Sequence, residues 1–141
     1  MCTKLLSHLT KLNDSSSDIE ASALITTEGL IVETTLRHNM ATDYLGAICA
    51  GAIMLGQHTS DKCASGELEH VIIKCAKNQI VMTYAGTDSI LAIITKHDTD
   101  LAVVFLELGA FVNGIQTIIS ANIMERIKSS RLGRGWVAHV H

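Results

Sequence analysis

The chain is 141 residues long, with 48% hydrophobic residues, only 18% charged residues and a net charge of −3 at pH 7. This composition excludes an intrinsically disordered chain, because such chains lack the apolar surface that offsets the entropy cost of ordering. The sequence has no proline, where about seven would be expected, which also excludes a proline-rich linker. The length predicts one compact domain.

The first part of the chain predicts a helix followed by a β-hairpin. Leucines at positions 5, 6, 9 and 12 recur at helical spacing, so residues 3–12 are predicted to form a short amphipathic helix. A polar turn over residues 13–18 ends it. Residues 20–26 and 30–36 are rich in β-formers, and the glycine-containing segment between them is typical of a hairpin.

The rest of the chain predicts a second helix, three strands and a last helix. Asn39 or Thr42 can cap a helix over residues 43–57, and residues 58–66 form a polar connector. Strands are predicted at 67–76, 79–85 and 89–95, because turn-forming residues separate these apolar runs. Asp98 or Asp100 opens a long helix that reaches about residue 128.

The strands therefore come in runs and do not alternate with helices. This order predicts an α+β fold, in which a five-stranded antiparallel sheet has one face covered by three helices, giving two layers. The domain is expected over residues 1–130, followed by a tail at 131–141. From Arg126 onward the chain carries four basic residues and no acidic one.

Two apolar stretches raise the question of a membrane span. Residues 44–56 number about 13, and residues 101–111 are interrupted by Glu107, whereas a spanning helix needs about 20 residues. The N-terminus lacks the core of a signal peptide, because His8 and Lys11 interrupt its apolar run. We expect no membrane insertion, a cytoplasmic location and reduced cysteines.

The known motifs of enzymes and cofactor sites do not occur in the sequence. It contains no P-loop, no dinucleotide-binding glycine motif, no zinc-protease motif and no nucleophile elbow. Its seven histidines are scattered, and the pair His139 and His141 lacks a visible third metal ligand. An acidic chain with few aromatic residues also argues against nucleic-acid binding. We therefore expect no cofactor and no metal.

Two acidic pairs have structural explanations. Asp98 and Asp100 flank a helix start, where carboxylates satisfy free backbone N–H groups. Glu67 and Glu69 are typical of charges that protect a strand edge from unwanted pairing.

Cys49 and Cys75 lie in apolar segments, where burial raises the pKa of a thiol and reduces its reactivity. We predict that the protein is not an enzyme.

The second helix carries the most informative pattern. Small residues recur four positions apart at Gly46 and Ala50 and at Ala47 and Gly51, and small residues allow another backbone to approach closely. The helix is also apolar nearly all round, Met54 included, so it should be buried on all sides. We predict that this helix forms a dimer interface. The alternative is a helix that is simply central in its own domain.

The order and spacing of these elements resemble the Roadblock/dynein light chain family over about residues 3–128. The resemblance is carried by residues 22–35 (SALITTEGLIVETT), 44–56 (YLGAICAGAIMLG), 71–95 (VIIKCAKNQIVMTYAGTDSILAIIT) and 101–108 (LAVVFLEL). It implies pairing of two copies through their second helices and third strands. The strand over residues 67–76 would then bring Val71, Ile73 and Cys75 into the interface.

The resemblance also implies a function. It suggests a homodimeric, non-enzymatic adaptor that binds and regulates a small Ras-like GTPase, as activator or scaffold, or a light-chain subunit of a motor complex. We expect partner contacts near the ends of the second helix, at Arg37, His38, Asp43 and Gln57. Two alternatives remain, namely a small-molecule sensor with an internal cavity and an enzyme that depends on Cys49 or Cys75.

Overall fold

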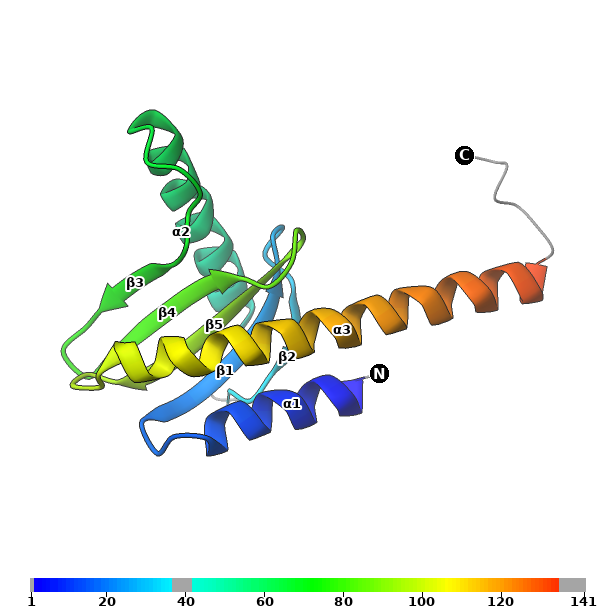
Figure 1. The fold of residues 1–141 in the computed structure, drawn as a ribbon, viewed down its shortest axis with the longest axis horizontal. Coiled ribbons are helices and arrows are strands. Elements are labelled where there is room, and N and C mark those ends of the chain that lie inside the picture. The colour runs from blue at the N-terminus through cyan, green and yellow to red at the C-terminus, as the bar shows by residue number, and fades with distance from the viewer. Residues whose placement is uncertain (1, 37–41, 135–141) are drawn as a thin grey trace.

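The computed structural model describes residues 2–36 and 42–134, with side chains for residues 4–36, 44–114 and part of 116–124. Its elements in chain order are α1 (Cys2–Asp14), β1 (Ile19–Thr26), β2 (Ile31–Thr34), α2 (Thr42–Lys62), β3 (Val71–Lys74), β4 (Asn78–Tyr84), β5 (Ser89–Lys96) and α3 (Leu101–Arg134) (Figure 1). This order confirms the α-β-β-α-β-β-β-α prediction.

The five strands form one antiparallel sheet in the order β2-β1-β5-β4-β3. The β1–β2 hairpin and the β3–β4–β5 meander are each built from consecutive strands. They join where β1 pairs with β5, with Leu24 opposite Leu91. The joining strands β1 and β5 therefore lie inside the sheet, and the short strands β2 and β3 form its two edges.

The molecule has three layers, so the expected two-layer arrangement is wrong. Helices α1 and α3 cover one face of the sheet and α2 covers the other (Figure 1). The reason lies in β1 and β5, which are buried on both faces along most of their length, as near-continuous apolar strands require. The α1–α3 side is centred on Leu9, Leu24, Leu91, Val104 and Leu108, and the α2 side on Ile25, Cys49, Ile53, Met82 and Ile90.

Three element bounds differ from the predicted ones by four residues or more. Helix α2 continues to Lys62, so the first part of the predicted polar connector is helical. Strand β3 begins only at Val71, and residues 67–70 are not strand. Helix α3 extends to Arg134, and Figure 1 shows it leaving the sheet and projecting as a free rod.

Candidate interaction surface

Helix α2 has two different faces. Its inner face packs Cys49, Ala50 and Ile53 against the sheet. Its outer face is exposed and apolar, with the side chain of Ile48 60% exposed. Exposed residues recur there at intervals of three or four positions, which places them on one stripe. We call this stripe the outer α2 face; its members are Tyr44, Ala47, Ile48, Gly51, Met54 and Leu55.

The five predicted interface residues of α2 divide between these faces. Ala47, Gly51 and Met54 are exposed and lie on the outer α2 face. Gly46 and Ala50 are buried within their own chain, so they take part in its internal packing. The structure also adds Tyr44, Ile48 and Leu55 to the exposed face, and their spacing along the helix is the signal that could have found them.

The two glycines of α2 illustrate the division. A Cβ added at Gly46 would overlap the carbonyl oxygen of Gly29 in the β1–β2 turn. Gly46 is therefore small because its own chain approaches closely. A Cβ added at Gly51 would meet no atom within 4 Å. Nothing in the part of the chain that the structure describes explains a glycine at position 51, where glycine costs the helix about 1 kcal/mol relative to alanine.

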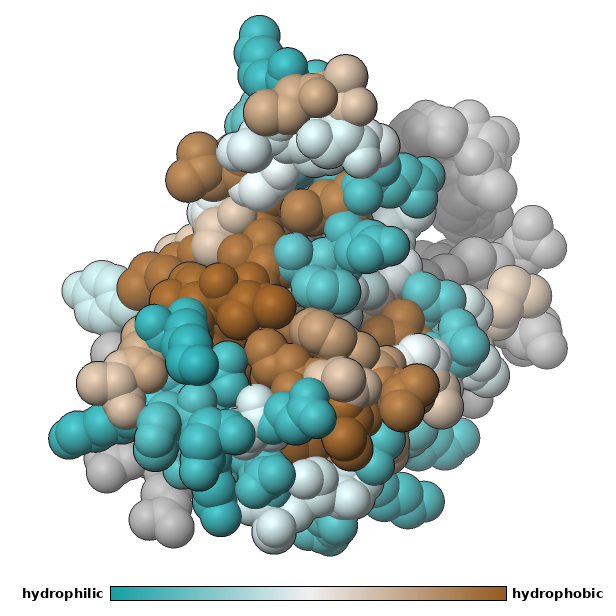
Figure 2. Space-filling model, turned by 60° about the vertical axis from the view of Figure 1, so that its left-hand side comes forward, coloured by the Kyte–Doolittle hydropathy of each residue, from teal (hydrophilic) through white to brown (hydrophobic). Residues whose placement is uncertain are grey.

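Strand β3 is the second part of the predicted interface. It pairs with β4 on one side, and within the described residues no strand pairs with its other side. Val71 is half-buried, whereas Ile73 and Cys75 are exposed, and Ile72 adds a 43% exposed side chain. Apolar side chains gather on the face of the molecule that carries this edge (Figure 2).

Helix α2 and strand β3 are in direct contact. A Cβ added at Gly56 would lie 2.9 Å from the Cγ2 atom of Val71 and 3.2 Å from the Cδ2 atom of Leu68. The C-terminal half of α2 therefore rests on the start of β3. The outer α2 face and the free β3 edge consequently belong to neighbouring elements.

The four predicted partner-contact residues are placed only in part. Arg37 and His38 lie outside the described residues, and the side chain of Asp43 is not among those described. Gln57 is half-buried on α2, and its Nε2 atom donates a hydrogen bond of 3.1 Å to the Oδ1 atom of Asp61. The contact role of this set stays a prediction.

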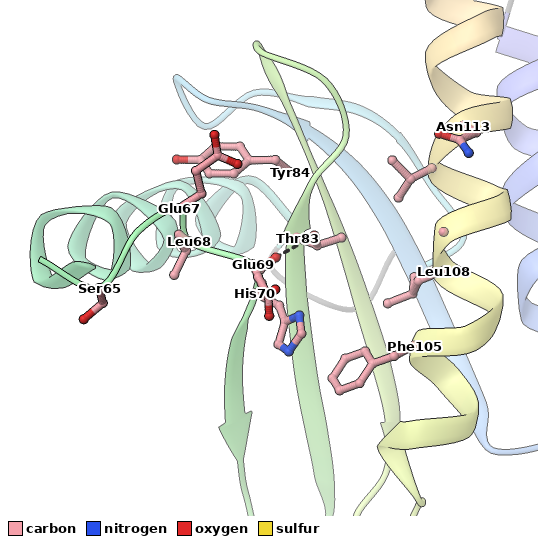
Figure 3. Close-up of a pocket in the computed structure, with 12 residues that line it drawn as sticks. Ser65, Glu67, Leu68, Glu69, His70, Thr83, Tyr84, Phe105, Leu108 and Asn113 are labelled. Atoms are coloured by element: carbon pink, nitrogen blue, oxygen red, sulfur yellow. Dashed lines mark hydrogen bonds between the residues drawn. The ribbon is translucent and has the colours of Figure 1, made fainter. Parts of the chain in front are cut away.

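A groove of about 910 Å³ lies beside β3 and was not predicted from the sequence (Figure 3). Its walls are the segment over residues 65–70, the end of β4 and the first turns of α3. The Thr83 hydroxyl donates a hydrogen bond of 2.9 Å to the Glu69 carbonyl oxygen. The His70 ring stacks on Phe105 with 4.2 Å between ring centroids. The groove exists because residues 67–70 diverge from β4 before pairing starts at Val71.

The cysteines occupy different environments. Cys49 is buried on the α2 side of the sheet, and desolvation raises the pKa of its thiol above the ordinary value of 9.0. Cys63 and Cys75 are exposed. The expected apolar surroundings are therefore found for Cys49 but not for Cys75, because β3 ends at Lys74.

Two further tests concern ligands. Within the described part of the chain, no group of three or more His, Cys, Asp or Glu side chains is placed to hold a metal ion. The hollow between α2 and the sheet, lined by Leu36, Leu45 and Ile80 among others, measures only about 10 Å³. Ligand pockets usually measure about 300–1,000 Å³, so this hollow is too small for a metabolite.

One helical segment, Leu101–Ile118, is long and apolar enough to cross a membrane by length and composition alone, with a mean hydropathy of 1.7. In the structure, Val104 and Leu108 of this segment are buried against the α1–α3 side of the sheet. Some of the apolar side chains in this segment are therefore explained by their burial in the core of the domain.

Solved structures with the same fold include three bacterial proteins. A Roadblock/LC7 domain from Streptomyces avermitilis has a TM-score of 0.77 and 18% identity, covering 83% of this chain and 98% of its own. MglB from Myxococcus xanthus has a TM-score of 0.76 and 19% identity, covering 84% and 97%. The gliding protein MglB from Thermus thermophilus has a TM-score of 0.72 and 13% identity, covering 83% and 89%. Such low identities show the fold alone.

The family follows from the sequence itself. No curated protein matches the chain significantly in sequence. The model of the Roadblock/LC7 domain, however, matches residues 5–95, which is well over half of the chain. This span runs from α1 to the end of β5. The chain therefore belongs to the Roadblock/LC7 domain family, as its element order predicts.

Proposed function

We propose that the protein is a homodimeric adaptor that binds a small Ras-like GTPase and regulates it, as activator or scaffold. As a Roadblock/LC7 domain the chain has an adaptor or regulatory role, and domains of this family are generally non-enzymatic. The GTPase partner is what the family resemblance implies. The single observation that carries the dimer is the exposed, apolar outer α2 face beside a free strand edge.

Burial of the outer α2 face would stabilise a dimer considerably. A large aliphatic side chain contributes about 1.5–3 kcal/mol when it moves from full exposure to full burial. Tyr44, Ile48, Met54 and Leu55 are all more than half exposed. Gly51 lies among them, and its missing side chain would let a second helix approach closely. A contiguous apolar patch of this kind is typical of an interaction site.

The regulation would act by holding the partner rather than by supplying a catalytic charge. GTPase activation often uses an arginine that stabilises the transition state. No motif in the sequence marks one of its arginines for that role. The family resemblance implies instead that the adaptor positions segments of the GTPase. A metabolite sensor of the kind considered from the sequence would need an internal cavity, and the enclosed hollow between α2 and the sheet measures only about 10 Å³. The groove of about 910 Å³ beside β3 is open to solvent.

Sedimentation equilibrium of Ile48→Asp tests the dimer. We expect the unaltered chain to be a dimer at micromolar concentration and the variant to be a monomer, because a carboxylate would be buried in an apolar interface. Leu106→Asp on α3 is the matched control, since Leu106 is 82% exposed and distant in sequence from α2 and β3. A monomeric unaltered chain, or equal dissociation of both variants, would contradict the proposed dimer.

A second experiment tests the GTPase. Small GTPases encoded in the same genome are mixed with the unaltered chain, each loaded with GDP or with a non-hydrolysable GTP analogue. We expect one of them to bind in one nucleotide state, with its GTP hydrolysis or its localisation changed. Failure of every such GTPase to bind would overturn this function and would leave the dimer result standing.

A further inference from the structure

The groove beside β3, called the α3 groove below, has a definite chemical character. Glu67 and Glu69 line it, and none of the described residues that line it is a Lys or Arg. Its apolar part comes from Leu68, Phe105 and Val112 among others, together with the ring of Tyr84. Figure 3 shows the labelled side chains among them arranged around one opening between the segment that precedes β3 and helix α3. Such a site suits a segment that combines positive charge with an aromatic or aliphatic side chain.

The end of β4 adds a second feature to the α3 groove. The first residue of β3, Val71, pairs with Met82 of β4. Thr83 and Tyr84, which follow Met82 in β4, therefore extend past the beginning of β3 and have no pairing residue in that strand. Both residues line the α3 groove. An extended peptide can lie along a strand end that has no neighbouring strand on one side.

The chain itself contains a segment with the complementary chemistry. Residues 131–141 read RLGRGWVAHVH, with two arginines, no acidic residue, two valines and Trp136, which is the single tryptophan of the protein. We propose that this C-terminal segment of one copy docks in the α3 groove of a second copy, with Arg131 and Arg134 facing Glu67 and Glu69.

The length of α3 prevents the same contact within one molecule. Asn113 is the last residue of α3 that lines the groove, and Arg131 lies 18 positions further along the same helix. At about 1.5 Å per residue, this separation is about 27 Å along the helix axis. The helix holds Arg131 and Arg134 away from the groove of their own chain. Docking of these arginines therefore requires a second copy.

This contact is separate from the proposed pairing through the outer α2 face. None of the groove residues belongs to that face. The contact would thus link one dimer to another. It does not depend on the GTPase function, and the two can fail independently.

A tryptophan-fluorescence titration tests the proposal. The receptor is the full chain carrying Arg131→Ala, Arg134→Ala and Trp136→Phe, so that its own tail carries no charge that matches either the original or the charge-reversed groove, and does not fluoresce. The titrated ligand is a synthetic peptide of residues 131–141, whose Trp136 is then the sole tryptophan in the sample. We expect a saturable blue shift of the tryptophan emission, weakened by added salt because the contact pairs opposite charges.

Matched charge reversals locate the binding site. Glu67→Lys with Glu69→Lys in the receptor should weaken peptide binding about tenfold, since two attractions become repulsions. Glu20→Lys with Glu28→Lys is the control, because both residues are exposed glutamates outside the groove and change the net charge equally. A peptide with both arginines changed to glutamate should bind the Glu67→Lys and Glu69→Lys receptor better than the original receptor.

Two outcomes would overturn the proposal. One is the absence of a saturable shift at peptide concentrations up to the millimolar range. The other is equal weakening by both pairs of charge reversals, which would show attraction to the overall charge of the protein and not to the groove.

Discussion

Gly46 and Gly29 show how a single hydrogen in place of a side chain sets the distance between two elements. Gly29 has φ +97°, in the left-handed region that favours glycine, and its carbonyl oxygen occupies the space a Cβ of Gly46 would need. Both contacting groups are backbone, so neither can move aside without shifting α2 or the β1–β2 turn.

Gly46→Ala is therefore expected to lower the free energy of unfolding by about 1–3 kcal/mol, despite the better helix propensity of alanine. Urea denaturation at constant protein concentration measures the change. Gly109→Ala is the control, since a Cβ there meets no atom within 4 Å, and it should raise stability by up to about 1 kcal/mol. Equal effects of the two substitutions would contradict the packing described.

The buried thiol of Cys49 gives a prediction on reactivity. Because burial raises its pKa, Cys49 stays protonated at neutral pH and should react slowly with iodoacetamide in the native protein. The exposed Cys63 and Cys75 should react fast. Site-resolved mass spectrometry after short labelling distinguishes the three sites. Fast native labelling of Cys49 would contradict its burial.

The same thiol contributes to the pH dependence of stability. The pKa of the Cys49 thiol is higher in the folded than in the unfolded state, because burial disfavours the thiolate. The contribution of the neutral thiol to the free energy of unfolding is therefore fully present below about pH 9, and it is lost as the pH rises through the folded-state pKa. The difference in unfolding free energy between the unaltered chain and Cys49→Ala should shrink between pH 8 and pH 11. A constant difference over this range would contradict the shift.

At the scale of elements, a small polar network fixes α1 against the β1–β2 hairpin. The hydroxyl of the buried Ser22 donates to the Oδ1 atom of Asn13 at 2.9 Å, and the Nδ2 atom of Asn13 donates to the Thr35 hydroxyl at 2.9 Å. The Ser22 backbone N–H also donates to that hydroxyl at 2.9 Å. One asparagine at the end of α1 thus joins β1 to the chain beyond β2.

Asn13→Ala should lower the free energy of unfolding by about 1–3 kcal/mol, because it removes hydrogen-bond partners from buried polar groups. Thr10→Ala is the matched control on the same helix, since its hydroxyl bonds only to the Leu6 carbonyl on an exposed surface. Chemical denaturation of both variants checks the expectation, and a smaller loss for Asn13→Ala than for Thr10→Ala would refute it.

Element order and type were predictable because each strand of the meander is bounded by turn residues and each helix has an apolar repeat. The start of β3 was not predictable, because residues 67–70 continue directly into the apolar run and only the path of the chain in space shows that pairing with β4 begins at Val71. The close contact of Gly46 with Gly29 was also not predictable from the sequence, because it depends on how α2 crosses the β1–β2 hairpin. The exposed stripe of Tyr44, Ile48 and Leu55 was within reach from its spacing.

At the scale of the whole molecule, the sequence prediction placed all helices on one face of the sheet, although the apolar pattern of the strands indicates that both faces are covered. Strands such as β5, with six successive buried residues, need apolar neighbours on both sides. Such a sheet divides the helices between its faces. The family resemblance predicted the fold correctly because it rests on the order of all elements together. The positions of surface side chains depend on packing between elements, which no short motif encodes.

The part played by α3 in folding is testable by truncation. Its contribution to the hydrophobic core extends to Ile118 among the described side chains. A chain ending at Ala121 should keep the thermal midpoint of the full chain within a few degrees. A chain ending at Asp100 loses Val104 and Leu108 together with the half-buried side chains around them, and its free energy of unfolding should fall by at least about 3–6 kcal/mol, the contribution of the two fully buried side chains alone. Circular dichroism melts of the two truncated chains measure both changes, and a large loss of stability in the chain ending at Ala121 would contradict the expectation.

The length of α3 also changes how the molecule moves through water. Its 34 residues make a rod about 51 Å long, whereas a compact chain of 141 residues has a radius of gyration of about 14 Å. Translational friction is therefore larger than the mass of the protein suggests, and gel filtration would overestimate that mass. Rotational diffusion carries the tip of the rod through a sphere much wider than the body, so the basic end of the chain meets other molecules first.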